Sequence, residues 1–464
     1  MVATLEPQAK IGKAAIGALG ALALALGTLQ AVVEPSLPML QHDLGIGPAA
    51  GSLIFITLLI TGAVVAPIAG KLGDRYGGKR VLVVLMTAVS AGGLLSSVAP
   101  NLPVLLLGQV LQGAMVGALP LSFILVRKHL PPGRTQVAVG VVSGLFTGGG
   151  LVGMLSAGPI AEHLSRHWMF AIPTIAIIAA TLTVARLMPD DPPAESDARI
   201  DWLGVILLSC TLVGLVLGFT AVTGGGLPPL ASAGVIVVVA ALATGWVLVE
   251  RRAASPMVDL RMLAMPAVWS AGVVTLLMSL GLGMAVYLVP QLLSAPASAY
   301  GFGADPSEIG VFLVPATVAG VVAGTVAGIA ARRFGPRAVV TAGAAATAAA
   351  LIALGPLHDA TWQLVAARAL IGFAVSVSAV ALLAGTATAV DAKDTGIATS
   401  LLVVTRVIGV AIGAQTAGAI LDAGTDPATG LPAESSFTTG FVTAGLIAAA
   451  SLLAVRAMKK GTQS

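Results

Sequence analysis

Long apolar stretches alternate with short polar ones from one end of the chain to the other. A helix needs about 20 mostly apolar residues to cross a bilayer. Fourteen such stretches are found along the 464 residues, and they cover 14–39, 49–72, 80–99, 103–126, 136–160, 168–188, 202–222, 228–249, 266–294, 307–331, 338–356, 361–389, 396–421 and 437–457. They are too long for barrel strands and do not alternate in polarity, so the pattern predicts an all-α, multi-pass membrane protein.

The composition supports the membrane class and excludes several functions. Hydrophobic residues make up 57% of the chain and charged residues only 9%, whereas soluble domains carry about 25% charged residues. The net charge of +4 is not gathered into basic runs with aromatic residues, so no nucleic-acid partner is expected. Cys210 is the only cysteine and the five histidines show no ligand spacing, so neither a metal nor another cofactor is expected. Nucleotide-binding loops and catalytic triad spacings are also missing, which argues against an enzyme.

The basic residues predict the orientation of the spans. With both termini in the cytoplasm, 21 of the 24 Lys and Arg residues fall on the cytoplasmic side. Arg166 alone falls outside, and Arg368 and Arg406 are left within the membrane. Lys10 and Lys13 before the first stretch resemble a signal peptide, but the apolar run that follows is too long for a signal core and is expected to remain as a helix.

The two halves of the chain resemble each other at a nearly constant offset. The polar loop 70–80 is echoed at 328–337, the region around Gln109 matches that around Arg368, and three glycines near 149–158 match three near 409–418, at offsets of 258, 259 and 260. Chance similarity among glycine-rich helices is the alternative. The offsets favour duplicated six-helix bundles at 1–188 and 263–464, joined by a linker with two inserted helices at 189–262.

The loop after the second stretch resembles the signature motif of the major facilitator superfamily. The matching residues are Gly70, Leu72, Asp74, Arg75, Gly77, Lys79 and Arg80. The resemblance implies that Asp74 helps to latch the two bundles on the cytoplasmic side, and the alternative is a merely solvated turn. It also implies alternating access by rocking of the bundles.

A second motif resembles the glycine-rich sequence associated with antiporters. Its residues are Gly140, Gly149, Gly153 and Gly158, although Met154 and Ala157 replace a usual proline and glycine. Small residues let two helices approach closely, which gives the motif a packing role as well. The phrases at 201–204, 256–261 and 405–413 are similar to the fourteen-helix drug:proton antiporter branch of the family.

Two departures from that branch concern the coupling residues. The family's fourth helix usually carries an arginine where this chain has Gln109, and the acidic position of the first helix is Leu29. Glu34 is the one carboxylate well inside a predicted span, one turn after Gln30. Burial favours a protonated carboxylate and a nearby cation favours the ionised one. We therefore hypothesise that Glu34 is the proton-coupling acid and Arg368 its switchable partner.

Other roles remain open for the buried charges. Glu34 would also suit a cationic substrate or a fixed structural pair, and Arg406 either a structural role or substrate binding. The candidate cavity and substrate residues are Gln30, Gln109, Met115, Tyr287, Gln291 and Arg406.

The predicted function is proton-coupled export of hydrophobic or weakly cationic small molecules, such as drugs or antibiotics, across a bacterial cytoplasmic membrane. The partners would be the small-molecule substrate, protons and the lipid bilayer, and the protein would be a monomer. One alternative is a proton-independent facilitator or lipid-handling transporter of the same fold. An alternative of another class is a membrane sensor or assembly protein that does not transport.

Overall fold

The structure is a computed structural model, and it describes residues 12–130, 132–190, 202–223, 228–252, 265–390 and 395–457. Regular structure in these ranges is helical, apart from an isolated bridge between Thr425 and Pro432. The predicted all-α class is therefore confirmed. Contacts divide the chain into two compact units: Met1–Val33 with Thr61–Ile200 is unit 1, and Glu34–Ile60 with Asp201–Ser464 is unit 2.

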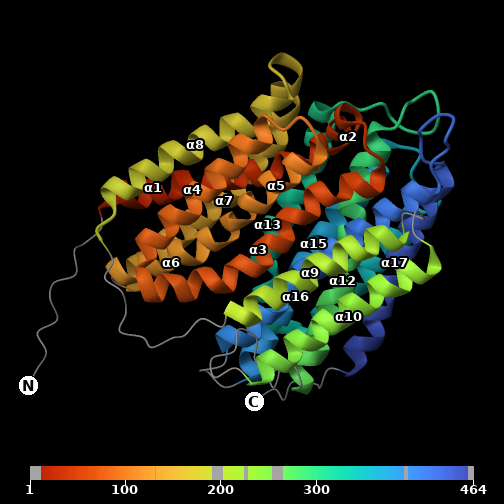
Figure 1. The fold of residues 1–464 in the computed structure, drawn as a ribbon. Coiled ribbons are helices and arrows are strands. Elements are labelled where there is room, and N and C mark those ends of the chain that lie inside the picture. The colour runs from red at the N-terminus through yellow and green to blue at the C-terminus, as the bar shows by residue number, and fades with distance from the viewer. Residues whose placement is uncertain are drawn as a thin grey trace, which may run out of the picture. The chain divides into compact units, whose positions relative to one another are not determined.

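Unit 1 is a bundle built around α1 and α4. In Figure 1, α1 runs along α7 and α8, and α4 along α5 and α8, in agreement with their contacts. The helices of this unit are α1 (Lys13–Ala31), the second half of α3 (Pro48–Tyr76), α4 (Gly78–Ser97), α5 (Leu102–Gln112), the 3₁₀ turn η1 (Gly113–Gly117), α6 (Ala118–His129), α7 (Pro132–His163) and α8 (Arg166–Leu187).

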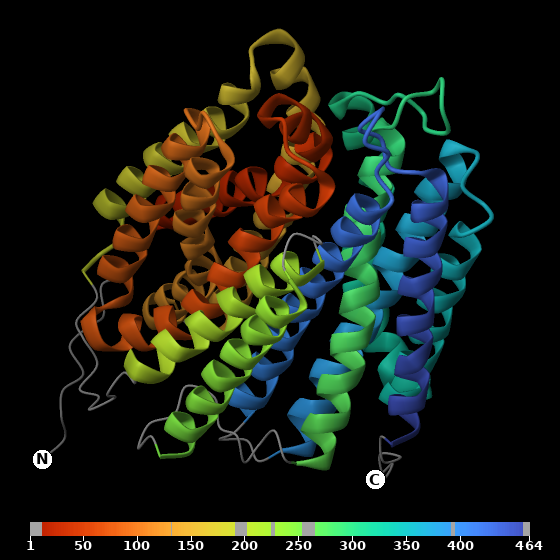
Figure 2. The same ribbon diagram turned by 45° about the vertical axis from the view of Figure 1, so that its right-hand side comes forward.

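Unit 2 is built around α12, which packs along α16 and α17 (Figure 2). A second row is formed by α13, α15 and α14, with α14 returning to α17. The helices of this unit are α2 (Val33–Leu44), the first half of α3, α9 (Trp202–Thr223), α10 (Pro229–Arg252), α12 (Pro266–Ser294), α13 (Pro306–Phe334), α14 (Pro336–Leu354), α15 (Thr361–Ala389), α16 (Thr395–Ala423) and α17 (Glu434–Ala457).

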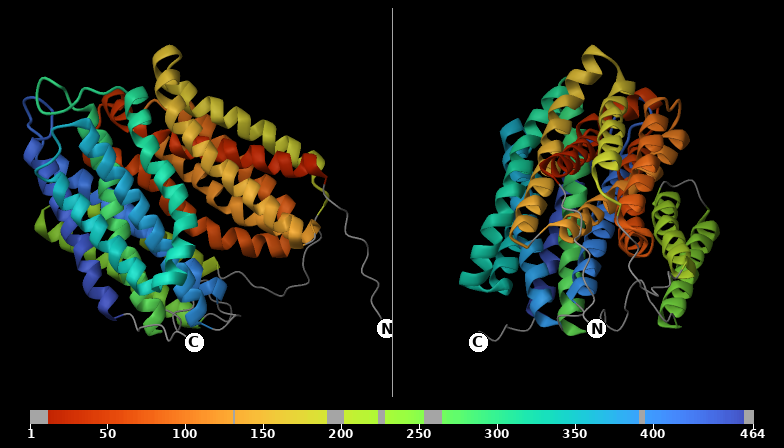
Figure 3. Two further views of the ribbon diagram at one scale, coloured as in Figure 1. Left: turned by 180° about the vertical axis from the view of Figure 1, so that it is seen from behind. Right: turned by 90° about the vertical axis from the view of Figure 1, so that its left-hand side faces the viewer.

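The two inserted helices, α9 and α10, pack against each other as a hairpin, visible as the yellow-green pair in Figure 3. No side chain described from residue 230 to 249 is buried in the protein. At the end of α10, Trp246 packs against a small core of Val268, Ala398 and Leu401. The hairpin is thus fixed at one end, and most of α10 is left to face lipid.

Thirteen helices of the described chain are long and apolar enough to cross a membrane. The apolar part of α9, Trp202–Leu215, is a shorter helix. The fourteen-span count and the cytoplasmic position of both termini remain predictions, as does the three-part division at residues 188 and 262.

Two predicted spans are interrupted. The stretch 14–39 divides into α1 and α2 at Val32. Pro35 and Pro38 have no N–H to offer to the carbonyls of Ala31 and Glu34, which explains a break there. The stretch 103–126 tightens into the 3₁₀ turn η1, whose ends are both glycine.

Candidate functional site

The two charges that the sequence paired are in direct contact in unit 2. Glu34 lies in the first turn of α2 and Arg368 in α15, and Arg368 Nη2 donates to Glu34 Oε1 over 2.9 Å. Their side chains are only 12% and 8% exposed. The Nε of Arg368 is buried and has no hydrogen-bond partner among the described residues. The pair therefore compensates each charge, yet leaves the guanidinium incompletely satisfied.

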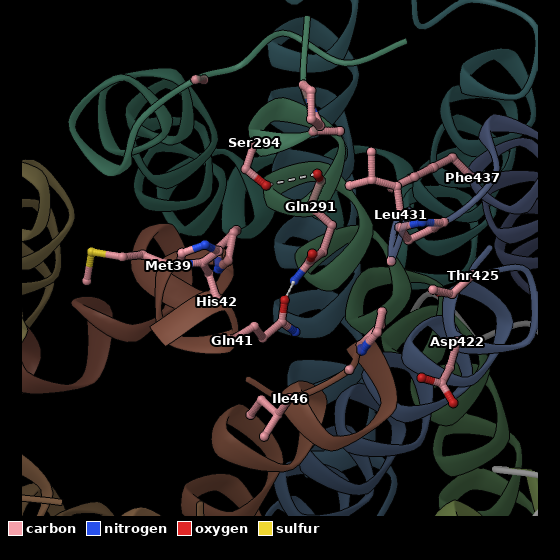
Figure 4. A pocket seen from close by; sticks show the side chains of 18 of the residues that line it. Met39, Gln41, His42, Ile46, Gln291, Ser294, Asp422, Thr425, Leu431 and Phe437 are labelled. Carbon is pink, nitrogen blue, oxygen red and sulfur yellow. Dashed lines mark hydrogen bonds between the residues drawn. The ribbon is translucent and has the colours of Figure 1, made fainter. Parts of the chain in front are cut away.

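A polar network near the end of α2 joins it to α12. Gln41 Nε2 donates to the Tyr287 hydroxyl over 2.7 Å, and Gln291 Nε2 donates to Gln41 Oε1 over 2.6 Å (Figure 4). Tyr287 in turn donates to the carbonyl of Pro48. Gln41 and Tyr287 are buried, so each of these bonds satisfies a group that water does not reach.

A cavity of about 730 Å³ lies beside this network, at the ends of α2, α12 and α16 in unit 2. Its wall is largely apolar and includes Pro35, Pro38, Leu431 and Phe437. Gln291 contributes an amide to the wall, and Figure 4 shows its side chain between Gln41 and Ser294. A cavity of this size and polarity suits a drug-sized molecule.

Asp422 and His42 are the ionisable groups of the cavity wall other than Tyr300. The Asp422 carboxylate has no ion pair or hydrogen bond with the described residues. His42 lies 3.6 Å from Asp43 instead. Burial raises the pKa of Tyr300, and the charge of Glu434 adds to this rise. Asp422 is therefore the group on this wall best suited to attract a cation.

The remaining candidate residues are not on the wall of this cavity. Glu34, Arg368 and Tyr287 do not line the cavity. Tyr287 is hydrogen-bonded to Gln41, which does. Gln109 and Met115 are buried in unit 1, and both amide atoms of Gln109 lack a partner among the described residues. Gln30, at the end of α1, is half-buried.

Arg406 lies in α16 beside the glycines of that helix and is half-buried. Within the described part of the chain its guanidinium has neither an ion pair nor a hydrogen bond.

The signature motif spans the junction of α3 and α4. Gly77 has φ 91°, a conformation that favours glycine, and it caps α4. Arg75 lies 5.3 Å from the ring of Tyr76. The side chain of Asp74 lies outside the described part, so the latch stays a prediction. Gly70 has open space around its Cα, so close packing does not account for it.

Lys79 and Arg80 of this motif lie in the first turn of α4. Lys79 Nζ donates to Asp190 Oδ1 over 2.9 Å, just after α8. This hydrogen bond, with the attraction of the same charge, lowers the pKa of Asp190. The Asp190 side chain is 98% exposed, so the pair contributes little to stability. Leu72 is half-buried and Arg80 is exposed.

The second half of the chain repeats the geometry of this junction. Gly335, between α13 and α14, has φ 81°, and Arg333 lies 5.3 Å from the ring of Phe334. The order cation, aromatic residue and positive-φ glycine therefore occurs in both units. This supports the duplication inferred from the sequence offsets.

The glycine motif on α7 serves close packing at two of its four positions. A Cβ on Gly149 would lie 2.0 Å from the carbonyl oxygen of Leu24, and one on Gly153 would lie 2.4 Å from that of Thr28. Gly158 is buried, while Gly140 has open space around it. Only glycine lets the α1 backbone approach this closely at 149 and 153.

The same contact is found between α12 and α16 in unit 2. A Cβ on Gly409 would lie 2.7 Å from the oxygen of Leu276, and one on Gly413 would lie 2.1 Å from that of Leu280. The glycines and the carbonyls they face follow the same four-residue step in both units. The packing of the two helix pairs is therefore duplicated as well.

Several residues of these contacts were not identified from the sequence. Gln41 and Asp422 lie just beyond the predicted ends of their spans. Ser52 Oγ donates to Gln415 Oε1 over 2.6 Å, joining α3 to α16. Ser52 and Gln415 lie inside predicted spans, where a polar side chain is the signal that could have drawn attention to them.

The apolar helices and their duplicated packing define a polytopic membrane protein. The sequence matches the family model for the Major Facilitator Superfamily at residues 19–294 and 271–462. The chain belongs to this superfamily, whose members are transporters and not enzymes.

The chain is also similar to individual bacterial proteins and to solved structures. The chain is 26% identical over 344 residues to a tetracenomycin C resistance and export protein of Streptomyces glaucescens, covering 73% of this chain and 63% of that protein. It is 26% identical over 353 residues to a uridine/deoxyuridine transporter of Lactococcus lactis, covering 74% and 72%. The crystal structure of a bacterial homologue of the lysosomal transporter Spinster shares the fold, with a TM-score of 0.70, 15% identity and coverage of 97% and 98%.

Proposed function

We propose that this protein is a proton-coupled exporter of hydrophobic or weakly cationic small molecules, in the fourteen-helix drug:proton antiporter branch. The observation that carries the proposal is the buried ion pair between Glu34 and Arg368. An ionised carboxylate costs about 2.5–3.5 kcal/mol at the centre of a membrane helix, so it is retained only where it acts or is paired. An ion pair whose two groups can separate lets the carboxylate be paired in one state and act in another.

The proposed coupling follows from the chemistry of the pair. A nearby guanidinium favours the ionised form of a carboxylate, and Arg368 donates directly to Glu34. Separation of the two groups would leave the carboxylate in an apolar environment, where it takes up a proton. Rocking of the two six-helix bundles, with the loop around Asp74 as latch, would alternate these states. Substrate binding would then be coupled to proton release.

The substrate class rests on the cavity and on the relatives. The wall of the cavity is mostly apolar and includes one unpaired carboxylate, Asp422, among the described residues. Such a wall favours a hydrophobic molecule with at most a weak positive charge. One relative carries the name of an antibiotic resistance and export protein. We propose a bacterial cytoplasmic membrane location and a monomeric protein.

The test uses everted membrane vesicles that hold a proton gradient reported by a pH-sensitive dye. Lipophilic cations, neutral antibiotics and uridine are added in turn to vesicles with the wild type or Glu34→Gln. The matched control is Asp43→Asn, which removes a carboxylate from the last turn of the same helix. Proton release that occurs with the wild type and the control but not with Glu34→Gln supports the proposal. Release that persists in Glu34→Gln would move the coupling acid elsewhere.

A proton-independent facilitator is the second candidate. Gln109 occupies the position where the resemblance expects an arginine, and its amide is fully buried without a partner among the described residues. A relative named as a uridine/deoxyuridine transporter adds nucleosides to the candidate substrates. Uptake of a radiolabelled substrate that an uncoupler leaves unchanged would favour the facilitator over the antiporter.

A further inference from the structure

Three side chains with metal-binding groups meet at one end of unit 2, and none of the three lines the cavity. His358 and Asp359 lie in the turn between α14 and α15, and Glu434 is the first residue of α17. One ligand atom of each lies within 4.8 Å of the others. The loops of this end are close together in Figure 2, and Thr438 Oγ1 donates to the carbonyl of Gly355 over 3.2 Å.

The hydrogen bonds of His358 determine which ring nitrogen faces the carboxylates. Nδ1 lies 2.8 Å from the carbonyl oxygen of Leu354, so it must carry a proton and donate it. In the neutral ring, Nε2 then presents a lone pair. This atom is buried, has no hydrogen bond with the described residues, and lies 3.4 Å from Glu434 Oε1. A lone pair facing a carboxylate is repulsive unless a proton or a metal cation lies between them.

The 3.4 Å distance between His358 Nε2 and Glu434 Oε1 matches the coordination of a divalent cation. Zinc binds imidazole nitrogen and carboxylate oxygen at about 2.0–2.2 Å, which places neighbouring ligands of a tetrahedron about 3.4 Å apart. A zinc-bound histidine also typically donates its other N–H to a backbone carbonyl or a carboxylate, which fixes the ring. His358 has this arrangement, with its ring also 6.3 Å from that of Phe441.

We propose that His358, Asp359 and Glu434 bind a divalent transition-metal cation, with Zn²⁺ as the probe that tests it. The three residues supply one nitrogen and two oxygens, and water completes the coordination. Bound metal ties the α14–α15 turn to the start of α17. The site is separate from the ion pair of the proposed coupling mechanism, so its test does not depend on transport.

Another histidine provides a matched control. His129 in α6 is also buried, and its Nδ1 lies 2.9 Å from the carbonyl oxygen four residues earlier, that of Leu125. His129 belongs to no group of three potential ligands among the described residues. His129→Gln therefore removes a similar buried imidazole without touching the proposed site.

The experiment uses the purified full chain in nanodiscs, with any affinity tag removed. Isothermal titration with Zn²⁺ after treatment with EDTA should give one saturable equivalent for the wild type and for His129→Gln. Zn²⁺ should also raise the Tm of both proteins in a thermal unfolding scan. His358→Gln and Glu434→Gln should each weaken binding by roughly tenfold or more. Co²⁺ should give the visible absorption of a low-coordinate site, which reports ligation even where a variant is less stable.

Two outcomes would overturn the proposal. One is a Zn²⁺ response of equal size in the wild type and in His358→Gln. The other is a wild type that does not respond to Zn²⁺ or Co²⁺. Asp359→Asn provides a conservative third variant, and unchanged binding in it would remove that residue from the site.

Discussion

Arg368 donates from Nη2 to Glu34 Oε1 over 2.9 Å, although 334 positions separate the two residues in the sequence. Both side chains are largely shielded, and neither lines the cavity described next to them. A shielded pair of this kind is weak evidence for stability, because desolvation offsets much of the attraction. For a transporter, the pair would matter because its contact can distinguish a conformation with the two groups paired from one with them apart.

Removal of one partner of this pair should lower the free energy of unfolding more than removal of both. Glu34→Leu leaves an unpaired arginine, and breaking a buried pair costs about 3–5 kcal/mol. The double variant Glu34→Leu/Arg368→Leu should be more stable than either single variant, with a coupling energy of about 0.5–3 kcal/mol. Unfolding in mixed micelles would measure this double-mutant cycle.

The exposed pair between Lys79 and Asp190 is the control for this cycle. Lys79→Gln and Asp190→Asn should show no measurable coupling, because the Asp190 side chain is 98% exposed. Equal coupling energies for the Glu34–Arg368 and Lys79–Asp190 pairs would contradict the prediction that burial sets the strength of the interaction.

Gly149→Ala should disrupt the packing of α1 on α7. The added Cβ would lie 2.0 Å from the oxygen of Leu24, so the helices must separate. The expected loss is at or above the upper end of the about 1–3 kcal/mol typical of overpacking. Gly413→Ala should have a similar effect on α12 and α16. Yield and thermal stability of the purified variants would measure both effects.

Gly140→Ala is the matched variant on α7. No atom lies within 4 Å of the added Cβ, and alanine favours a helix over glycine by about 1 kcal/mol. We expect unchanged or slightly higher stability. A loss as large as that of Gly149→Ala would show that close approach is not what the motif provides.

Tyr287→Phe should destabilise unit 2 by about 1–3 kcal/mol, because it leaves the buried Nε2 of Gln41 without its acceptor. It also removes the bond to the carbonyl of Pro48. Tyr76→Phe is the control, since that side chain is 45% exposed. The thermal unfolding temperatures of the two variants, each compared with that of the wild type, would test this. Equal decreases in the two variants would contradict the prediction.

Asp422→Asn should reduce the affinity for a lipophilic cation by roughly fivefold, which corresponds to about 1 kcal/mol. Its carboxylate lies on the cavity wall without an ion pair among the described residues. A neutral compound of similar size should bind as before. Asp426→Asn, beyond the end of α16, is the control, and fluorescence titration with both ligands provides the measurement.

Helix positions were largely predictable because the bilayer demands long apolar runs. The ranges predicted at 266–294 and 361–389 agree with α12 and α15 at both ends. The break at Val32 was not predicted, because a count of apolar residues does not detect carbonyls left unpaired by proline.

The site was only partly predictable. Glu34 and Arg368 could be identified because a charge within an apolar stretch needs a reason. Gln41 and Asp422 could not, because each lies within two residues of a predicted span end and has the polarity expected of a loop. The meeting of His358 with Glu434, 76 positions later, depends on the folding of a helix pair and leaves no local spacing in the sequence.

The exposed face of α10 has a consequence for the evolution of this chain. Its exposed side chains include Leu230, Ile236, Val237 and Val238, which are 58–85% exposed within the protein. At such positions, selection acts on the apolar character of the side chain and hardly on its shape, because it packs against lipid and not against protein. One aliphatic side chain can therefore replace another without loss, and this stretch should diverge faster among relatives than the glycine contacts of α7 and α16.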